Sequence, residues 1–384
     1  MQTTEILRTL IAHPTISADP NLALITFCHD FLRDAGAQVT LIKNETGQKA
    51  NLYATIGPTD RPGVLLSGHT DVVPVAGQNW TVPPFELTQT EDRVFGRGTA
   101  DMKGFVACAL AAALKASEME LKTPLHIALS YDEEIGCVGV RSMIEMLAAA
   151  PFRPRFCIVG EPTLMTVATG HKGKTAARVT STGRESHSAL APSALNAIHM
   201  ACDMISVIRD IQADIASFGA QDTDYDVPYT TLHVGKINGG VALNIVPNHT
   251  TFEFEIRNLA EDDPSKILER INKHRKAYLK KVRQDFPEAD VKIDITNSYP
   301  PLGTPKDSEV TTFVQSLTNS NATIKVAFGT EGGLFSSELG VPTVVCGPGS
   351  MEQGHKPDEF ISLSQLAECD AMLETLLQRL QSGL

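Results

Sequence analysis

The chain has 384 residues, of which 42% are hydrophobic and 20% charged, and it carries a net charge of -12. This length predicts two domains, or one large domain with an insertion, and the composition is ordinary for a globular protein. The acidic balance argues against nonspecific nucleic-acid binding, and no apolar stretch approaches the length of a membrane span.

The seven cysteines are odd in number, widely spaced and without a CxxC pair. Most lie in apolar runs, which is typical of buried, reduced thiols. The N-terminal stretch from Met1 to Ile11 lacks the basic region and long apolar core of a signal peptide. These features together predict a cytoplasmic protein.

Strands, loops and helices alternate through the first 160 residues. Apolar runs predict strands at 39–42, 52–56, 64–69, 125–131 and 156–159. Apolar periodicity predicts helices at 3–12, 22–35, 104–117 and 138–149. This alternation is typical of a layered α/β domain, in which ligands bind beyond the carboxyl ends of the strands.

The pattern changes at about Ala176. Four strands are predicted at 174–182, 229–237, 251–257 and 291–295, with helices at 193–217 and 264–286. These elements suit a compact α+β unit. We therefore predict an inserted domain at 176–293, between two parts of one domain at 1–175 and 294–384.

The α/β pattern returns after the insertion. Helices are predicted at 308–317 and 364–380, and strands at 323–327 and 343–346. A loop rich in Gly and Pro, residues 347–359, joins the last strand to the last helix.

Residues 168–175 nearly match a phosphate-binding P-loop, with Ala168 in place of the first Gly. That motif requires a helix directly after its Lys-Thr pair. Residues 176–182 predict a strand instead, so no nucleotide site is expected here.

Residues suited to metal binding follow the predicted strands. His69 ends one strand and is followed by Asp71, but such a pair on its own is more often structural than functional. The complete set of candidate ligands is His69, Asp101, Glu134, Glu161 and His355. Two imidazoles and three carboxylates suit two divalent ions, zinc foremost, with cobalt or manganese as substitutes.

Two such ions can share a water, lower its pKa and stabilise the oxyanion of a tetrahedral intermediate. A general base is also needed, and Glu133, beside Glu134, is the candidate. Adjacent like charges after a buried strand are costly unless a cation neutralises them, which favours a metal site over a solvated acidic turn.

Five stretches of the chain are similar to those of a known family: 67–74 (SGHTDVVP), 96–104 (GRGTADMKG), 132–136 (DEEIG), 160–163 (GEPT) and 354–359 (GHKPDE). They resemble the dinuclear zinc exopeptidases and deacylases, which include acetylornithine deacetylases, succinyl-diaminopimelate desuccinylases, aminoacylases and glutamate carboxypeptidases. The resemblance implies a mixed-sheet catalytic domain of the zinc aminopeptidase/carboxypeptidase type. It also implies that the insertion is a lid domain through which the protein forms a homodimer.

The resemblance further assigns the metal ligands. His69 and Glu161 would hold one ion, Glu134 and His355 the other, and Asp101 would bridge the two.

Other residues take roles from the same resemblance. Asp71 would orient His69, and Glu133 would take a proton from the attacking water and return it to the leaving amine. In the lid, His187 would steady the oxyanion, in family members from a neighbouring subunit, and Asn244 and Arg257 would contact substrate. An Arg fork suits an α-carboxylate.

Within the family, residues 170–174, 328–335 and 346–360 look most like acetylornithine deacetylases. The implied reaction is hydrolysis of N2-acetyl-L-ornithine to L-ornithine and acetate in arginine biosynthesis. Gly329, Thr330 and Glu331 would line the substrate pocket, with Glu331 either a partner for the ornithine ammonium or a solvated loop acid. The alternatives are a succinyl-diaminopimelate desuccinylase, a broad N-acyl-amino-acid amidohydrolase or dipeptidase, and a non-catalytic metal-binding paralogue.

Overall fold

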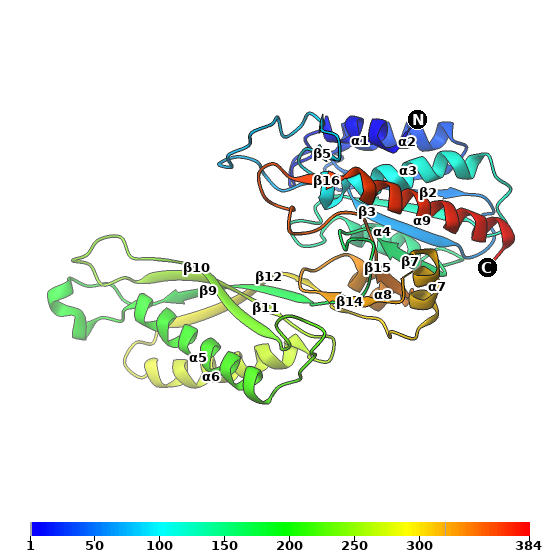
Figure 1. Ribbon diagram of the computed structural model, residues 1–384. Coiled ribbons are helices and arrows are strands. Elements are labelled where there is room, and N and C mark those ends of the chain that lie inside the picture. Colours follow the sequence, from blue (N-terminus) through cyan, green and yellow to red (C-terminus); the bar gives the residue numbers. More distant parts are fainter. Residues whose placement is uncertain (1, 319) are drawn as a thin grey trace. The chain divides into compact units, whose positions relative to one another are not determined.

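The computed structural model describes residues 2–318 and 320–384 (Figure 1). Their contacts divide the chain into two compact units, Met1–His171 with Leu302–Leu384, and Lys172–Pro301. The predicted insertion, 176–293, falls inside the second unit. Among the described residues, no helix is both long and apolar enough to cross a membrane.

A nine-stranded mixed sheet forms the centre of the first unit. The strand order is β1-β2-β6-β3-β7-β15-β8-β13, and β14 also pairs with β8. The bounds are β1 (Gln38–Lys43), β2 (Ala50–Ile56), β3 (Val64–His69), β6 (Leu125–Ser130), β7 (Phe156–Val159), β8 (Val167–His171), β13 (Leu302–Gly303), β14 (Thr323–Val326) and β15 (Thr343–Val345). Since β3 runs parallel to both β6 and β7, the carboxyl ends of these three strands share one edge of the sheet.

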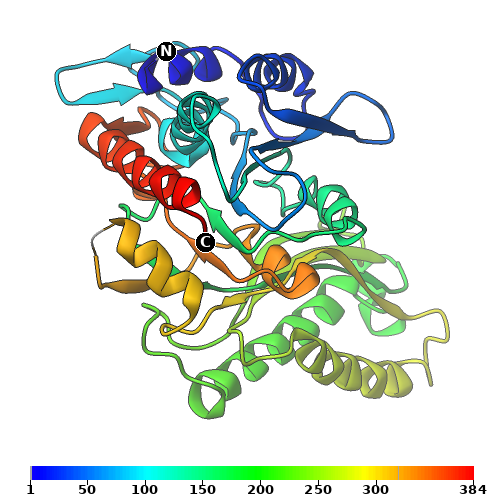
Figure 2. The same ribbon diagram turned by 90° about the vertical axis from the view of Figure 1, so that its right-hand side faces the viewer.

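One face of this sheet carries the main apolar core, which includes Val64 and Leu66. The helices on it are α1 (Thr3–Ile11), α2 (Leu22–Asp34), α3 (Gly104–Ser117), α7 (Glu309–Thr318) and α9 (Leu363–Ser382). Helix α3 packs against α9, drawn in red in Figure 2.

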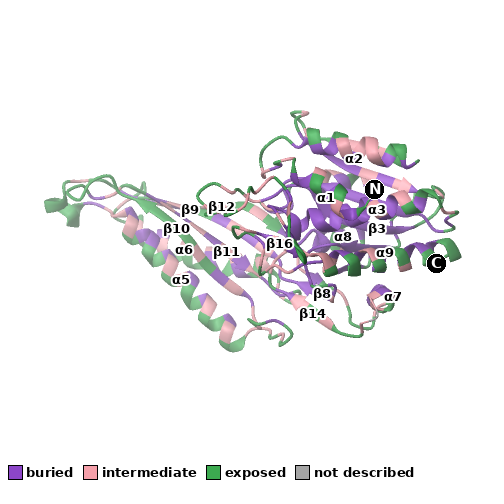
Figure 3. Cartoon of the chain, turned by 45° about the horizontal axis from the view of Figure 1, so that its top comes forward, coloured by how far each residue is buried: buried purple, intermediate pink, exposed green. Residues whose placement is uncertain are grey.

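The opposite face is covered by α4 (Val140–Ala148) and α8 (Gly332–Leu339). Successive residues of a strand face opposite ways, so Leu65, Ser67 and His69 lie on this second face. Both β3 and α8 are largely buried (Figure 3). The mixed sheet with helices on both faces confirms the predicted α/β fold class.

A small three-stranded sheet was not predicted. It pairs β16 (Phe360–Ser362) with β5 (Arg93–Phe95), and β5 with β4 (Thr88–Gln89). Each strand has only two or three residues, too few for an alternating pattern to stand out in the sequence. This sheet places the end of the loop 347–359 beside the short helical segment η1 (Thr99–Lys103).

The second unit is a four-stranded antiparallel sheet in the order β10-β11-β9-β12. Its elements are β9 (Lys174–Thr182), η2 (Ser188–Ser193), α5 (Ala197–Phe218), β10 (Thr231–Gly239), β11 (His249–Arg257), α6 (Pro264–Val282) and β12 (Asp290–Tyr299). Alternate residues of β9 and β11 are buried in a core with α5 and α6. The predicted composition of two helices and four strands is therefore correct.

Two differences from the predicted elements have local causes. Helix α5 begins four residues later than predicted, since the side chain of Asn196 accepts hydrogen bonds from the backbone N–H groups of Ile198 and His199. Helix α8 was missed because it opens on Gly332 and Gly333, which have low helix propensity.

His126, on β6, gives the first unit an expected pH dependence of stability. It is buried, and its Nδ1 lies 3.0 Å from the hydroxyl of Thr55. Burial lowers the pKa of His126 from 6.5 to about 4. Between these values the unfolded chain binds a proton that the folded chain does not, so stability falls by about 1.4 kcal/mol for each unit by which the pH drops. In the variant His126→Gln, the free energy of unfolding measured in urea should fall less steeply between pH 6.5 and 4. A pH dependence equal to that of the wild type would contradict the lowered pKa of His126.

Candidate metal centre

The carboxyl edge of the large sheet gathers acidic side chains around His69. His69 is the last residue of β3, Glu133 and Glu134 follow β6, and Glu161 follows β7. The segment η1 adds Asp101 from between the strands. Among the described residues, two sets of side chains bring their ligand atoms within 4.8 Å of one another: His69 with Glu133 and Glu161, and His69 with Asp101 and Glu134.

Asp101 lies between the two candidate imidazoles. Its Oδ1 is 2.9 Å from Nε2 of His69, and its Oδ2 is 3.1 Å from Nε2 of His355. The same nitrogen of His355 is 2.9 Å from Oε2 of Glu134, and Nε2 of His69 is 3.6 Å from Oε1 of Glu161. All five predicted ligands therefore form one connected cluster, in which His355, with half of its side chain exposed, is the most accessible to solvent.

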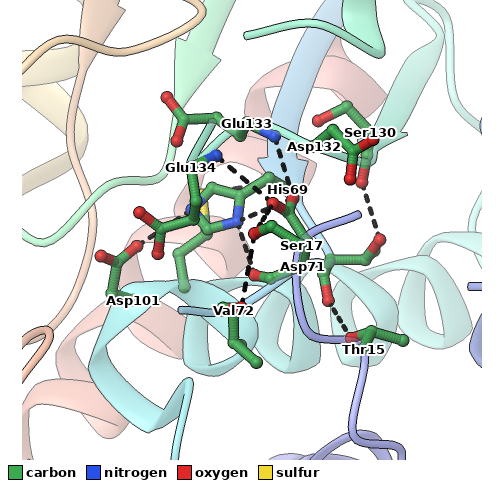
Figure 4. A network of polar contacts seen from close by, with 12 residues as sticks. Thr15, Ser17, His69, Asp71, Val72, Asp101, Ser130, Asp132, Glu133 and Glu134 are labelled. Carbon is green, nitrogen blue, oxygen red and sulfur yellow. Dashed lines mark hydrogen bonds and ion pairs between the residues drawn. The ribbon is translucent and has the colours of Figure 1, made fainter. Parts of the chain in front are cut away.

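Asp71 joins this cluster to the predicted base (Figure 4). Its backbone oxygen is 2.9 Å from Nδ1 of His69. Its carboxylate accepts hydrogen bonds from the backbone N–H of Glu133 (3.1 Å), the backbone N–H of Glu134 (3.3 Å) and the hydroxyl of Ser17 (2.6 Å). Asp71 thus contacts both the strand that carries His69 and the turn that carries the two glutamates.

Burial raises the pKa values of the three glutamates of the cluster. For Asp101, burial is outweighed by hydrogen bonds from His355 and His69, which lower its pKa. The pKa of Glu134 rises to about 7, through burial and then the charge of Asp101. Burial also raises the pKa values of Glu133 and Glu161 well above their ordinary range. Contacts with Asp101 and Glu134 raise the pKa of His355 to about 10. Excess negative charge therefore draws protons into the metal-free cluster.

This donor set fits divalent cations. Among the described residues, Oε1 of Glu134 is buried and has no hydrogen-bond partner. A shielded carboxylate oxygen without a partner is unusual in a folded protein. Carboxylate oxygens and imidazole nitrogens are the ligands that zinc and related ions bind. Cations at this place would both satisfy the oxygen and replace the protons.

The backbone at Gly160 leaves no room for a side chain. A Cβ there would lie 1.9 to 2.3 Å from the ring of Phe105 in α3. We expect Gly160→Ala to destabilise the protein by about 1–3 kcal/mol and to displace Glu161. Thermal unfolding measures the first effect and metal content the second. Gly235→Ala is the control, since its Cβ would meet only the ring of His233, at 3.7 Å or more; equal effects of the two changes would contradict the prediction.

The predicted lid residues lie in the second unit. His187 caps η2, and its Nδ1 accepts a hydrogen bond from the backbone of Ala189. The backbone oxygen of Asn244 accepts from Ser188, next to His187. Arg257 contacts Glu255 and the hydroxyl of Tyr299, each at 3.0 Å.

Glu331 lies in the first unit, on the second face of the sheet. It is 1% exposed, and its Oε2 accepts a hydrogen bond from Ser67 at 3.2 Å. Its Oε1 has no partner among the described residues, and burial raises its pKa to about 7. Thr330 is buried beside it. Glu331 is therefore not a solvated loop acid.

The P-loop alternative is excluded by the structure. Residues 167–171 form β8 and residues 174–182 form β9, so no helix follows the Lys-Thr pair.

Several residues that support the ligand segments were not predicted from the sequence. Lys49 forms a buried ion pair with Asp132 at 2.6 Å, directly before Glu133. Arg97 forms another with Glu359 at 2.7 Å. Both pairs join residues more than 80 positions apart. Glu359 and Arg97 lie in motif stretches, and that was the only sequence signal available for them.

Comparisons with known proteins agree with this arrangement. Residues 65–379 match the model of peptidase family M20/M25/M40. An acetylornithine deacetylase of Myxococcus xanthus is 34% identical over 369 residues, which cover 95% of this chain and 93% of that protein. An acetylornithine deacetylase of Photorhabdus laumondii is 31% identical over 380 residues, covering 97% and 96%.

Solved structures share the fold at low sequence identity. An M20 family metallo-carboxypeptidase from Sulfolobus solfataricus has a TM-score of 0.81 at 19% identity, with 100% of each chain covered. Human carnosine dipeptidase 1 has a TM-score of 0.72 at 15% identity, covering 99% of this chain and 97% of that one.

Proposed function

The chain belongs to peptidase family M20/M25/M40, and from this premise we propose that it hydrolyses N2-acetyl-L-ornithine to L-ornithine and acetate, a step of arginine biosynthesis. It is a metal-dependent hydrolase. The substrate proposal is supported by acetylornithine deacetylases at 31–34% identity that match this chain over almost its whole length.

We propose that the cluster around Asp101 holds two divalent ions, with zinc the best match to its mixed nitrogen and oxygen donors. His69 and Glu161 would bind one ion, Glu134 and His355 the other, and Asp101 both. The single observation that carries this proposal is that the two oxygens of Asp101 face two different imidazoles, at 2.9 and 3.1 Å. When bound, the ions lower the pKa of water and stabilise negative charge on the amide oxygen.

In this proposal Glu133 is the general base. It takes the proton of the attacking water and passes it to the nitrogen of the leaving amine. A base that later acts as an acid works best when its pKa lies near the working pH. In the metal-free protein, burial raises the pKa of Glu133 above its ordinary range. Asp71 holds the base in place through the backbone N–H of Glu133.

Substrate contacts are proposed for six residues. Arg257 offers a guanidinium fork for the α-carboxylate, His187 and Asn244 would contact the reacting amide, and Gly329, Thr330 and Glu331 would face the ornithine side chain. The protein is proposed to act in the cytoplasm, as a homodimer formed through the second unit. All seven cysteines are free thiols, as expected there.

The decisive experiment compares kcat/KM for N2-acetylornithine, N-succinyl-diaminopimelate and N-acetylmethionine, with zinc or cobalt added to metal-free protein. We expect the highest value for acetylornithine and negligible activity before metal is added. A higher kcat/KM for either of the other two substrates would replace the substrate assignment. Absence of activity on all three, with metal bound, would favour a non-catalytic paralogue.

A further inference from the structure

Glu359 makes an unusual number of contacts for a residue that does not face the candidate ions. It is 1% exposed, and both of its carboxylate oxygens are used twice. Oε2 accepts hydrogen bonds from the guanidinium of Arg97 at 2.7 Å and from the backbone N–H of Gly98 at 3.1 Å. Oε1 accepts from the backbone N–H groups of Ala100 at 2.9 Å and Asp101 at 3.1 Å.

The segment that carries Glu359 also carries His355. Residues 355–359 are bound to residues 96–101 by further contacts: the backbone N–H of Gly96 donates to the backbone oxygen of Glu359 at 2.9 Å, and Arg97 donates to the backbone oxygen of Lys356 at 3.3 Å. Gln78 donates to the backbone oxygen of His355 at 2.8 Å. One carboxylate is therefore the centre of the contacts between the segments that present Asp101 and His355.

These contacts satisfy backbone groups that would otherwise be buried without partners. Three N–H groups of this turn, those of Gly98, Ala100 and Asp101, point at the same side chain. Only an ionised carboxylate offers acceptors to all of them and to Arg97. A glutamine of the same size would turn an NH2 group toward one pair of donors. A buried ion pair contributes little net stability. Here the pair lies where the segment that carries Asp101 meets the segment that carries His355.

We propose that Glu359 is a positioning residue that sets the separation of Asp101 and His355 before a metal ion arrives. This inference rests on the proposed function, in which both residues bind metal. Pre-organised ligands bind an ion without first losing conformational freedom. Residues that orient ligands in this way typically change metal affinity by about 10- to 100-fold when replaced.

The test is Glu359→Gln, studied by calorimetric titration of metal-free protein with zinc. We expect the wild type to bind two ions per chain, and the variant to bind the weaker of the two about 10- to 100-fold less tightly. Activity of the variant should recover as zinc is raised, with kcat near the wild-type value at saturation, because no reacting group has been removed. Thermal unfolding of the metal-free proteins shows whether the variant is folded.

Asp358→Asn is the matched control. The carboxylate of Asp358 anchors the same segment through the backbone N–H (2.8 Å) and hydroxyl (2.9 Å) of Thr81, but does not contact the segment of Asp101. Zinc affinity in this variant should stay within about threefold of the wild type, well short of the effect of a residue that orients a ligand. Equal losses in both variants would mean that anchoring of the loop, not the contact with Asp101, governs affinity.

If Glu359→Gln does not fold, Glu359→Asp replaces it. The shorter carboxylate keeps the charge opposite Arg97 but does not reach both sets of donors, so zinc affinity should again fall. A folded variant with unchanged zinc affinity overturns the positioning role alone. A wild type that binds no zinc overturns the proposed function instead.

Discussion

Replacing Glu133 by glutamine is expected to lower kcat by about 10²- to 10⁴-fold while both metal ions stay bound. The amide keeps the size of the side chain and its place in the turn, where Asp71 accepts a hydrogen bond from the backbone. It does not accept the proton of the attacking water. The measurement is steady-state kinetics on acetylornithine, combined with metal analysis of the same sample.

Metal analysis is essential because geometry alone does not separate the base from a ligand. Glu133 and Glu134 both have carboxylate oxygens close to His69, in different groups of candidate ligands. Glu134→Gln is therefore the informative partner variant, since it should lose metal as well as activity. If Glu133→Gln loses metal and Glu134→Gln keeps it, the two roles are reversed. Glu352→Gln, in an exposed part of the loop, should change neither quantity.

Replacing Asp101 by asparagine is expected to abolish binding of at least one of the two ions. Asp101 is the one described side chain whose two oxygens face both His69 and His355. An amide offers a single oxygen and turns a donor toward the second ion, so it does not bridge. At limiting zinc, activity should fall by more than the roughly 10- to 100-fold expected of residues that only orient ligands.

The measurement is the number of zinc ions bound per chain, by titration of protein first treated with a chelator. Chelator treatment of the wild type should remove activity, and added zinc or cobalt should restore it. Asp92→Asn is the control, since Asp92 is an exposed aspartate whose carboxylate contacts its near neighbours Arg93 and Thr90. Two tightly bound ions in Asp101→Asn would refute the bridging role.

The fold class followed from the sequence because its signals are local. Strands such as β3 and β6 are rich in apolar residues and buried along their whole length, and such segments are visible without knowing their neighbours. The elements that were missed lack a local signal. The strands β4, β5 and β16 are only two or three residues long, and β16 is held to β5 by pairing between residues about 270 positions apart. Strand β8 contains the Gly-His stretch that resembles a loop.

The candidate ligands also followed from the sequence, because ligand type and position after a strand are properties of single segments. His69, Glu134 and Glu161 each stand at or just beyond a strand end, where a parallel sheet exposes side chains to a ligand. Asp101 and His355 belong to the same predicted set by side-chain type, and the family resemblance then assigned each ligand to an ion. Apart from Asp71, the sequence did not reveal which residues support the ligands.

Only the tertiary structure shows how the supporting residues contact the segments that carry the ligands. Asp71 was expected to orient His69, but the contacts of its carboxylate with the backbone of Glu133 and Glu134 appear only when β3 and β6 lie side by side. Likewise, Glu359 meets the backbone of Asp101 across 258 positions of sequence. A hydrogen bond depends on distances of a few tenths of an ångström, and such distances are set by packing of the whole unit, not by any pattern along the chain. The sequence by itself therefore determined which chemical groups the site contains, and the folded structure determined what holds them in place.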